Sequence, residues 1–196
     1  MDVYQHLVGR HMNPINYAVS WDDDTACFLL FDLSGRIVGY QQYRPNAPKT
    51  MHNDPKEGRY YTYFTGRKDE KQFSVWGLET WDYSAHVLFV TEGIFDAVRL
   101  HEFGYSAVAV LSNDPKFLRN WLFLVRQQRK VIVVCDDDVA GRKNVDQAAG
   151  VGMGPHRQVG AVAGRAKEGL GGVPAPAVAL VHIEIAGPFI VTTVEV

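Results

Sequence analysis

The sequence predicts an α/β fold with a small parallel sheet flanked by helices, preceded by a smaller β-rich region. Apolar runs at 87–90 and 131–135 have the length and composition of buried strands. A helical pattern over 94–103 follows the first of these runs, with its apolar residues on one face. Such a strand-helix-strand order is typical of parallel strands joined by right-handed crossovers.

The other elements follow from turn signals and local composition. Residues 27–43 predict a hairpin, because the turn Ser34-Gly35 separates two strand-like runs. A proline-rich loop at 44–59 precedes an aromatic strand at 60–64. Residues 1–20 suggest only a short helix or arm. The remaining expected elements are strands at 106–111, 178–185 and 189–196, and helices at 115–128 and 140–149.

These elements divide the chain into three parts. We expect a β-rich N-terminal subdomain at 1–84, an α/β core at 85–150 and a C-terminal tail at 151–196. Within the tail, 150–176 is rich in Gly, Ala, Val and Pro and shows no clean period.

Composition excludes several classes of protein. The 196 residues are 46% hydrophobic with a formal net charge of −2, so any nucleic-acid contact must come from a local patch. Two cysteines cannot build a zinc ribbon, and no zinc is expected. There is no signal-peptide pattern, and no apolar stretch reaches the ~18 residues that span a bilayer. We therefore expect a cytoplasmic protein without membrane contact.

Carboxylates follow both of the buried strand patterns. Glu92 comes directly after the strand at 87–91, and Asp136 and Asp138 follow the strand at 131–135. In an open parallel sheet, ligands bind beyond the carboxyl ends of the strands. Carboxylates gathered there are costly unless a cation neutralises them, and hard oxygen ligands suit Mg²⁺ or Mn²⁺.

Several classes of protein that act on phosphate groups place acidic residues at the end of a strand. The Gly-x-x-x-x-Gly-Lys-Ser/Thr loop of Walker-type ATPases is absent. A phosphatase-like Asp-x-Asp would follow the first strand of the sheet, whereas here it follows the third. A solvated turn that caps a helix is the other interpretation of Asp136 and Asp138.

The two acidic motifs together resemble the TOPRIM domain, which DnaG-type primases, topoisomerases and several nucleases share. Glu-Gly-x-x-Asp-Ala begins at Glu92, and Asp-x-Asp-x-Ala-Gly-Arg begins 44 positions later at Asp136. The resemblance implies that Glu92 is a metal-proximal acid or general base and that Asp136 and Asp138 hold Mg²⁺. It further implies close backbone approach at Gly93 and Gly141, a structural role for Asp96, and phosphate contacts from Arg142 and Lys143, for which an exposed helix face is the alternative.

Three segments ahead of this block resemble the N-terminal subdomain of DnaG-type (bacterial or phage) primase cores, which favours a primase-like protein of the phage or mobile-element type. They are the strand-turn-strand entry at 31–40, the Pro-Lys segment at 48–55 and the segment at 73–79. With the acidic motifs, the resemblance covers roughly 27–149. It implies Mg²⁺-dependent synthesis of RNA primers from NTPs on a single-stranded DNA template. A replicative helicase and a separate zinc-ribbon module would be possible partners.

The β-rich part also carries a basic and aromatic segment. Basic side chains neutralise phosphate, and aromatic rings stack on unpaired bases. By the resemblance, Arg44 and Lys49 are the candidates for contact with template or nucleotide phosphate. The alternative is a solvated basic loop beside a tyrosine-containing hairpin core. The seven basic residues between 41 and 71 are Arg44, Lys49, Lys56, Arg59, Arg67, Lys68 and Lys71.

Two departures from the primase pattern leave other functions open. The chain has no zinc ribbon, and residues 147–183 contain only one acid, Glu168, where further metal-site acids are expected. A TOPRIM nuclease that cleaves DNA or RNA at the same acidic site is the second hypothesis. A non-catalytic module that binds nucleic acid is the third.

Overall fold

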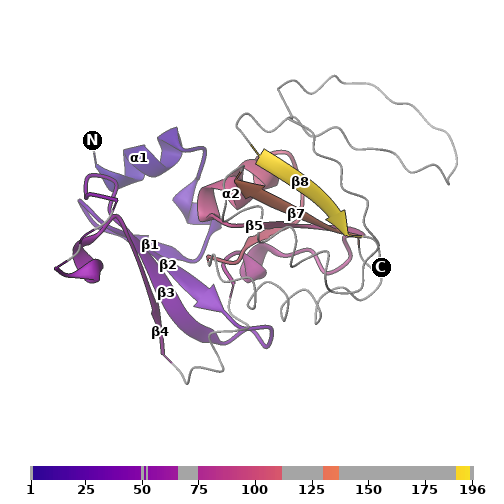
Figure 1. Ribbon diagram of the computed structural model, residues 1–196, viewed down its shortest axis with the longest axis horizontal. Helices are drawn as coiled ribbons and strands as arrows, with labels where there is room; N and C mark the ends of the chain where they lie inside the picture. Colours follow the sequence, from indigo (N-terminus) through magenta and orange to yellow (C-terminus); the bar gives the residue numbers. More distant parts are fainter. Residues whose placement is uncertain are drawn as a thin grey trace, which may run out of the picture.

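The computed structural model describes residues 2–49, 51, 53–65, 75–111, 130–136 and 189–194. Within these ranges the chain forms two four-stranded sheets, with a helix between them (Figure 1). The first is antiparallel and the second is largely parallel. The predicted α/β class with a β-rich N-terminal part is confirmed.

The antiparallel sheet, here sheet A, has the strand order β1-β2-β3-β4. The hairpin predicted over 27–43 and the strand at 60–64 are confirmed. Gly35 lies in the β2–β3 turn at a φ of 79°, a left-handed conformation that glycine adopts without a steric penalty. The strands are β1 (Val19–Trp21), β2 (Ala26–Phe31), β3 (Ile37–Tyr43) and β4 (Tyr60–Phe64).

One face of sheet A forms part of the core. Along β2, Ala26, Phe28 and Leu30 are buried and the residues between them are half-buried. The short helix α1 (Val3–Gly9) adds Val3 and Leu7 to the same hydrophobic cluster. Alternation of this kind is typical of a sheet with one buried and one solvated face.

The second sheet, sheet B, has the order β6-β5-β7-β8. β5 pairs in parallel with both β6 and β7, which confirms the predicted parallel sheet. The tail strand expected at 189–196 is present as β8 and pairs antiparallel with β7. The strands are β5 (Val87–Thr91), β6 (Ala107–Ala109), β7 (Lys130–Asp136) and β8 (Phe189–Val194).

Helix α2 (Ile94–Glu102) lies between the two sheets (Figure 1). It confirms the predicted helix. The helix ends at Glu102 and is followed by the C-cap residue Phe103 and by Gly104, whose φ of 76° is typical of the residue after a helix C-cap. Its buried residues pack in one cluster with Phe28 of sheet A and Phe89 of sheet B. The opposite face of sheet B packs on a second cluster that includes Leu78 and Trp81, so both faces of this sheet are buried.

A two-residue segment joins the sheets directly. Val75 forms an antiparallel bridge with Phe31 at the end of β2, and Trp76 forms one with Ala109 of β6. Trp76 is fully buried. The first cluster therefore contains residues from both sides of the boundary predicted at 84/85, and that boundary stays a prediction.

Three 3-10 helices complete the described part: η1 (Pro14–Asn16), η2 (Pro55–Glu57) and η4 (Leu78–Thr80). The elements expected at 115–128, 140–149 and 178–185 lie outside the described residues. In the part that the structure describes, no helix has the length and apolar character needed to cross a membrane.

Candidate active site at the edge of the parallel sheet

Two of the predicted acids lie at the same edge of sheet B. Glu92 directly follows β5 and is half-buried. β5 and β7 run parallel with Thr91 beside Val134, and Asp136 ends β7 two residues later. The backbone thus brings both positions to the carboxyl edge of neighbouring parallel strands, where open α/β sheets bind ligands. Asp138 lies outside the described residues.

The backbone around Glu92 is anchored to the segment that follows β6. The Val110 amide donates to the Thr91 carbonyl at 3.0 Å, and the Leu111 amide donates to the Glu92 carbonyl at 3.1 Å. These bonds extend the β5–β6 pairing past the end of the strand. Glu92 therefore sits on a fixed backbone rather than on a solvated loop.

Gly93 and Asp96 form the start of helix α2. Gly93 is the N-cap residue, and Asp96 lies in the first helical turn. A Cβ atom at Gly93 would lie 2.8 Å from Oδ2 of Asp96, so this carboxylate packs closely over the glycine. The positive end of the helix favours an acid there. The structural role of Asp96 stays a prediction, and this contact supports it.

The donor atoms available at this edge suit a divalent cation. Positions 92 and 136 hold glutamate and aspartate, residue types whose carboxylates are hard oxygen ligands of the kind that Mg²⁺ prefers. Among the described residues, no group of three His, Cys, Asp or Glu side chains is arranged to hold a metal ion. Asp138, the third predicted ligand, is not among them. The residue types at the two described positions are compatible with a divalent cation, and a complete set of ligands would need at least one further acid.

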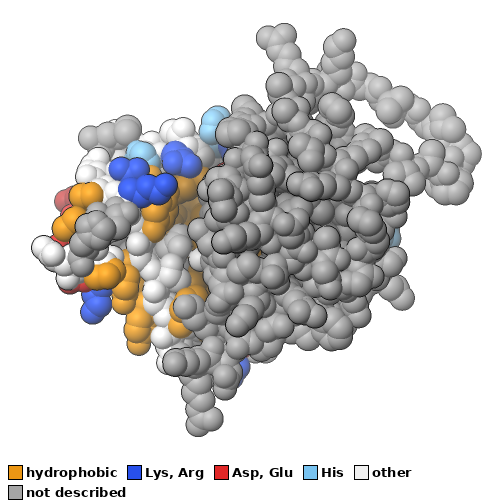
Figure 2. Space-filling model, viewed as in Figure 1, with side chains coloured by type: hydrophobic (Ala, Val, Ile, Leu, Met, Phe, Trp, Pro, Cys, Tyr) orange, Lys and Arg blue, Asp and Glu red, His pale blue; other side chains and the backbone are white. Residues whose placement is uncertain are grey.

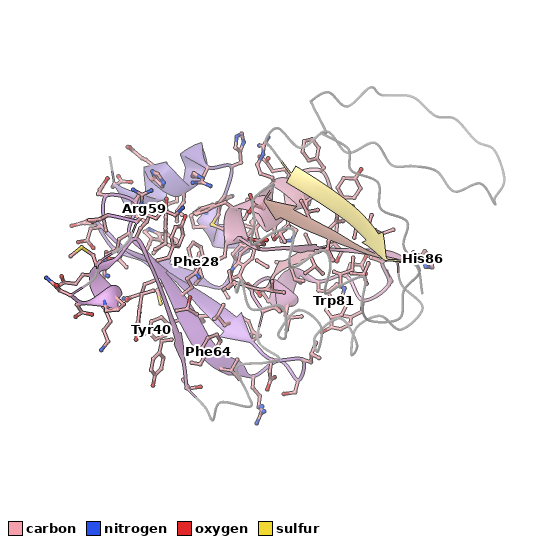
Figure 3. All side chains as sticks on the ribbon, in the orientation of Figure 1. Phe28, Tyr40, Arg59, Phe64, Trp81 and His86 are labelled. Atoms are coloured by element: carbon pink, nitrogen blue, oxygen red, sulfur yellow. The ribbon has the colours of Figure 1, made fainter. Side chains whose placement is uncertain are left out.

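A basic cluster lies beside the start of α2. The Arg10 guanidinium carbon is 4.1 Å from the centre of the Phe95 ring, three residues after Glu92. Burial lowers the pKa of His6, and the nearby charges of Arg10 and Arg59 lower it further. Figure 2 shows Lys or Arg and His side chains gathered over α1, and Figure 3 labels Arg59 in this part of the molecule.

Two of the four basic residues selected from the sequence, Arg44 and Lys49, occupy the loop after β3. The Arg44 guanidinium donates to the Lys56 carbonyl, and its amide donates to the Arg59 carbonyl at 2.9 Å. Arg59 in turn donates through Nε to the Ala47 carbonyl at 3.1 Å. Arg44 and Arg59 therefore hold this loop closed, while Lys49 is exposed on it.

Sequence reasoning did not single out Arg10 or Arg59. Arg59 was one of seven basic residues in its segment, and Arg10 follows a short helix with no motif around it. Only the packing of Arg10 on Phe95 brings it to the Glu92 motif. The predicted residues Gly141, Arg142 and Lys143 lie outside the described residues.

The tyrosines of sheet A divide between its two faces. Tyr43 and Tyr60 are paired across β3 and β4 on the core side, where Tyr43 also contacts Phe95. Tyr40 and Tyr63 are paired on the opposite side, with ring centres 5.3 Å apart. Tyr63 is 43% exposed, and Tyr40, labelled in Figure 3, extends from this outer side. The outer face of sheet A therefore presents a pair of tyrosine rings, tilted relative to one another, toward solvent.

Comparison with known proteins supports the fold. Residues 89–154 match the family model described as Toprim-like. A search of curated proteins gave no significant match. The structure is similar to the primase fragment of the bacteriophage T7 primase-helicase protein, with 20% sequence identity and a TM-score of 0.51. That match covers 75% of this chain and 56% of the phage fragment.

Two bacterial primase structures are also similar. The E. coli primase catalytic core is 21% identical with a TM-score of 0.47. The match covers 69% of this chain and 45% of the E. coli structure. The RNA polymerase domain of Mycobacterium tuberculosis primase DnaG is 19% identical with a TM-score of 0.46, and 74% of this chain covers 49% of it. The chain thus spans about half the length of these structures. The predicted resemblance to the TOPRIM-containing cores of DnaG-type primases is confirmed at the level of the fold.

Proposed function

We propose that this chain carries out primase-type nucleotidyl transfer, joining ribonucleotides on a single-stranded DNA template with Mg²⁺ as the divalent ion. The observation that carries the proposal is the placement of Glu92 and Asp136 at one carboxyl edge of sheet B. The fold shared with primase cores is consistent with it. A replicative helicase and a separate zinc-ribbon module are proposed as partners.

The chemistry requires little covalent participation by the protein. A primer 3′-hydroxyl attacks the α-phosphate of the incoming nucleotide, and pyrophosphate leaves. Glu92 would accept the hydroxyl proton, while Asp136 and Asp138 would hold the divalent ion. When bound, Mg²⁺ neutralises charge on the phosphate oxygens. Catalysis would come mainly from positioning and from charge stabilisation.

The surfaces next to the acidic edge suit the nucleic acid and the nucleotide. Arg10 packs on Phe95 at the start of α2, and Arg59 lies near the same His6 side chain as Arg10. Both would neutralise phosphate charge. The outer tyrosines of sheet A would stack on unpaired bases, since stacking needs no particular base. Lys49 is exposed on its loop and would contact the backbone of the template.

A primer-synthesis assay tests the proposal. The chain is incubated with single-stranded DNA, labelled NTPs and Mg²⁺, with and without a helicase and a zinc-ribbon protein. Glu92→Gln and Asp136→Asn should each reduce product at least about 100-fold, because they remove a proton acceptor and a metal ligand. Asp23→Asn, in an exposed loop, is the matched control and should leave synthesis unchanged.

Two outcomes would replace the proposal. Cleavage of labelled DNA or RNA in the absence of NTPs, abolished by Glu92→Gln, would identify a nuclease that uses the same edge. Binding of single-stranded DNA without any turnover, unaffected by Asp136→Asn, would identify a non-catalytic module. Full primer synthesis by Glu92→Gln would remove Glu92 from the site.

A further inference from the structure

Thr91 is an unusual residue for the end of a core strand. The described residues include only two buried polar side chains, Gln41 and Thr91, and Thr91 is 1% exposed. The other four residues of β5 are apolar. A valine would fill the same volume without a polar group, so the hydroxyl needs a partner to be tolerated there.

The Thr91 hydroxyl has partners on both sides of the Glu92 turn. Oγ1 donates to the Gly93 carbonyl at 2.9 Å and lies 3.3 Å from the Val108 carbonyl of β6. One contact closes the turn over Glu92, and the other ties that turn to the neighbouring strand. The hydroxyl therefore acts where the chain leaves the sheet.

The backbone opposite this turn is also specialised. Leu111, whose amide donates to the Glu92 carbonyl, has a φ of 53°. A left-handed conformation is uncommon for a leucine and persists only where the surrounding structure enforces it. Leu111 follows Val110, whose amide makes the last β5–β6 bond, and its own amide pairs with the Glu92 carbonyl. Both sides of the turn are thus built to hold one backbone geometry.

We infer that Thr91 is a positioning residue for Glu92, its hydroxyl fixing the turn that presents the Glu92 carboxylate at the edge of sheet B. The inference rests on the proposed function, in which Glu92 acts on the reacting hydroxyl. Thr91 itself does not contact substrate. Its contribution is to keep Glu92 in the productive geometry, since small displacements of a catalytic group lower turnover strongly.

Three variants test this role. Thr91→Val keeps the shape and removes the hydroxyl, whereas Thr91→Ser keeps the hydroxyl. Thr80→Val is the matched control. The half-buried Thr80 hydroxyl also donates to a backbone carbonyl, that of Gly77 at 2.9 Å, but it is not part of the Glu92 turn. We expect a kcat about tenfold lower for Thr91→Val with KM for NTP unchanged, rescue to within about threefold by Thr91→Ser, and normal turnover for Thr80→Val.

Amide hydrogen exchange gives a readout that does not depend on activity. The Leu111 amide should exchange faster in Thr91→Val than in the wild type, Thr91→Ser or Thr80→Val. Wild-type turnover by Thr91→Val, or unchanged exchange at Leu111, would overturn the inference. If the wild-type chain made no primers at all, the proposed function would fail, and the exchange rates would still decide whether Thr91 fixes the Glu92 turn.

Discussion

The two sheets differ in which of their surfaces are accessible to solvent. Sheet A alternates buried and half-buried residues along β2 and turns its outer face to solvent. In sheet B, residues 88–91 of β5 and 131–134 of β7 are buried whichever way their side chains point. A sheet buried on both faces can offer a ligand only the ends of its strands, whereas a half-exposed sheet can bind along its face. The proposed chemistry accordingly takes place at the edge of sheet B, and the proposed stacking of bases takes place on the outer face of sheet A.

The two sheets differ in exposure, but they are packed together around one shared hydrophobic core. Phe95, from the motif that begins at Glu92, packs edge-on against Phe28 and Tyr43 of sheet A. Trp76 contacts Phe28 as well and bridges to β6 of sheet B. The acidic edge and the aromatic face are therefore held in a fixed relation by buried aromatic residues.

The largest predicted effect breaks this connection. Trp76→Ala should destabilise the chain by about 3–5 kcal/mol, because it empties a fully buried position that packs on Tyr17 and Phe28. Urea unfolding followed by circular dichroism measures the change. Trp21→Ala, at a residue that is 41% exposed, is the control and should cost much less. Separate transitions for the two sheets in the wild type would show that they do not share a core.

Sequence patterns predicted the elements whose burial leaves a clear period. Continuous apolar runs indicated β5 and β7, and the apolar stripe at 94–103 indicated α2. The three-residue strand β1 was not predicted, since it is too short to show a period and forms only by pairing with β2. The expected strand at 106–111 is shorter in the structure, at 107–109, although the Val110 amide still donates to the Thr91 carbonyl of β5. The left-handed φ of 53° at Leu111 is incompatible with a continuing strand.

The candidate site was predictable to the extent that it depends on topology. Acids that follow adjacent parallel strands must lie at one edge, so Glu92 and Asp136 could be paired from the sequence. The placement of Arg10 on Phe95 and the bridges of Val75 and Trp76 depend on tertiary packing, which leaves no local pattern. Thr91 was hidden for a different reason, since threonine is an ordinary strand residue until its burial is known.

A smaller effect would disturb sheet A alone. Gly39→Ala should cost about 1–3 kcal/mol, because the new Cβ would overlap the Tyr63 carbonyl oxygen of β4. Gly9→Ala is the matched control: nothing lies within 4 Å of its Cβ, and the change should be neutral or slightly stabilising. Hydrogen exchange should show the loss of protection first in β3 and β4. Equal loss in β5 and β7 would contradict a local effect on sheet A.

The aromatic face can be tested through binding. Tyr63→Ala should weaken binding of single-stranded DNA by about 1–3 kcal/mol, because it removes one stacking surface, while Tyr63→Phe keeps the ring and should bind normally. Fluorescence anisotropy with a labelled oligonucleotide measures both. Tyr83→Ala, 61% exposed beside sheet B, is the control. Unchanged affinity for Tyr63→Ala would leave the outer face of sheet A without a role in binding.

The smallest predicted effect compares two acids that each follow a strand. Asp32 directly follows β2 as Glu92 directly follows β5. Its carboxylate accepts hydrogen bonds within its own turn, from the Ser34 hydroxyl at 2.6 Å and from the Ser34 and Arg36 amides at 2.9 and 3.0 Å. Burial opposes ionisation of Asp32, yet these hydrogen bonds outweigh it and lower its pKa to about 2. The folded pKa lies below the unfolded value of about 3.9, so the ionised group stabilises the fold above that pH.

This stabilisation should disappear as the pH falls through about 2, where Asp32 becomes protonated in the folded state. Asp32→Asn should therefore cost no more than about 1 kcal/mol at neutral pH and flatten the acid limb of the stability curve, measured by thermal unfolding from pH 2 to 7. It should leave primer synthesis intact, whereas Glu92→Gln should reduce synthesis at least about 100-fold. Equal loss of synthesis in both variants would mean that Asp32 contributes to the reaction as well as to its own turn. Sheet A would then take part in catalysis, and its role would not be limited to binding.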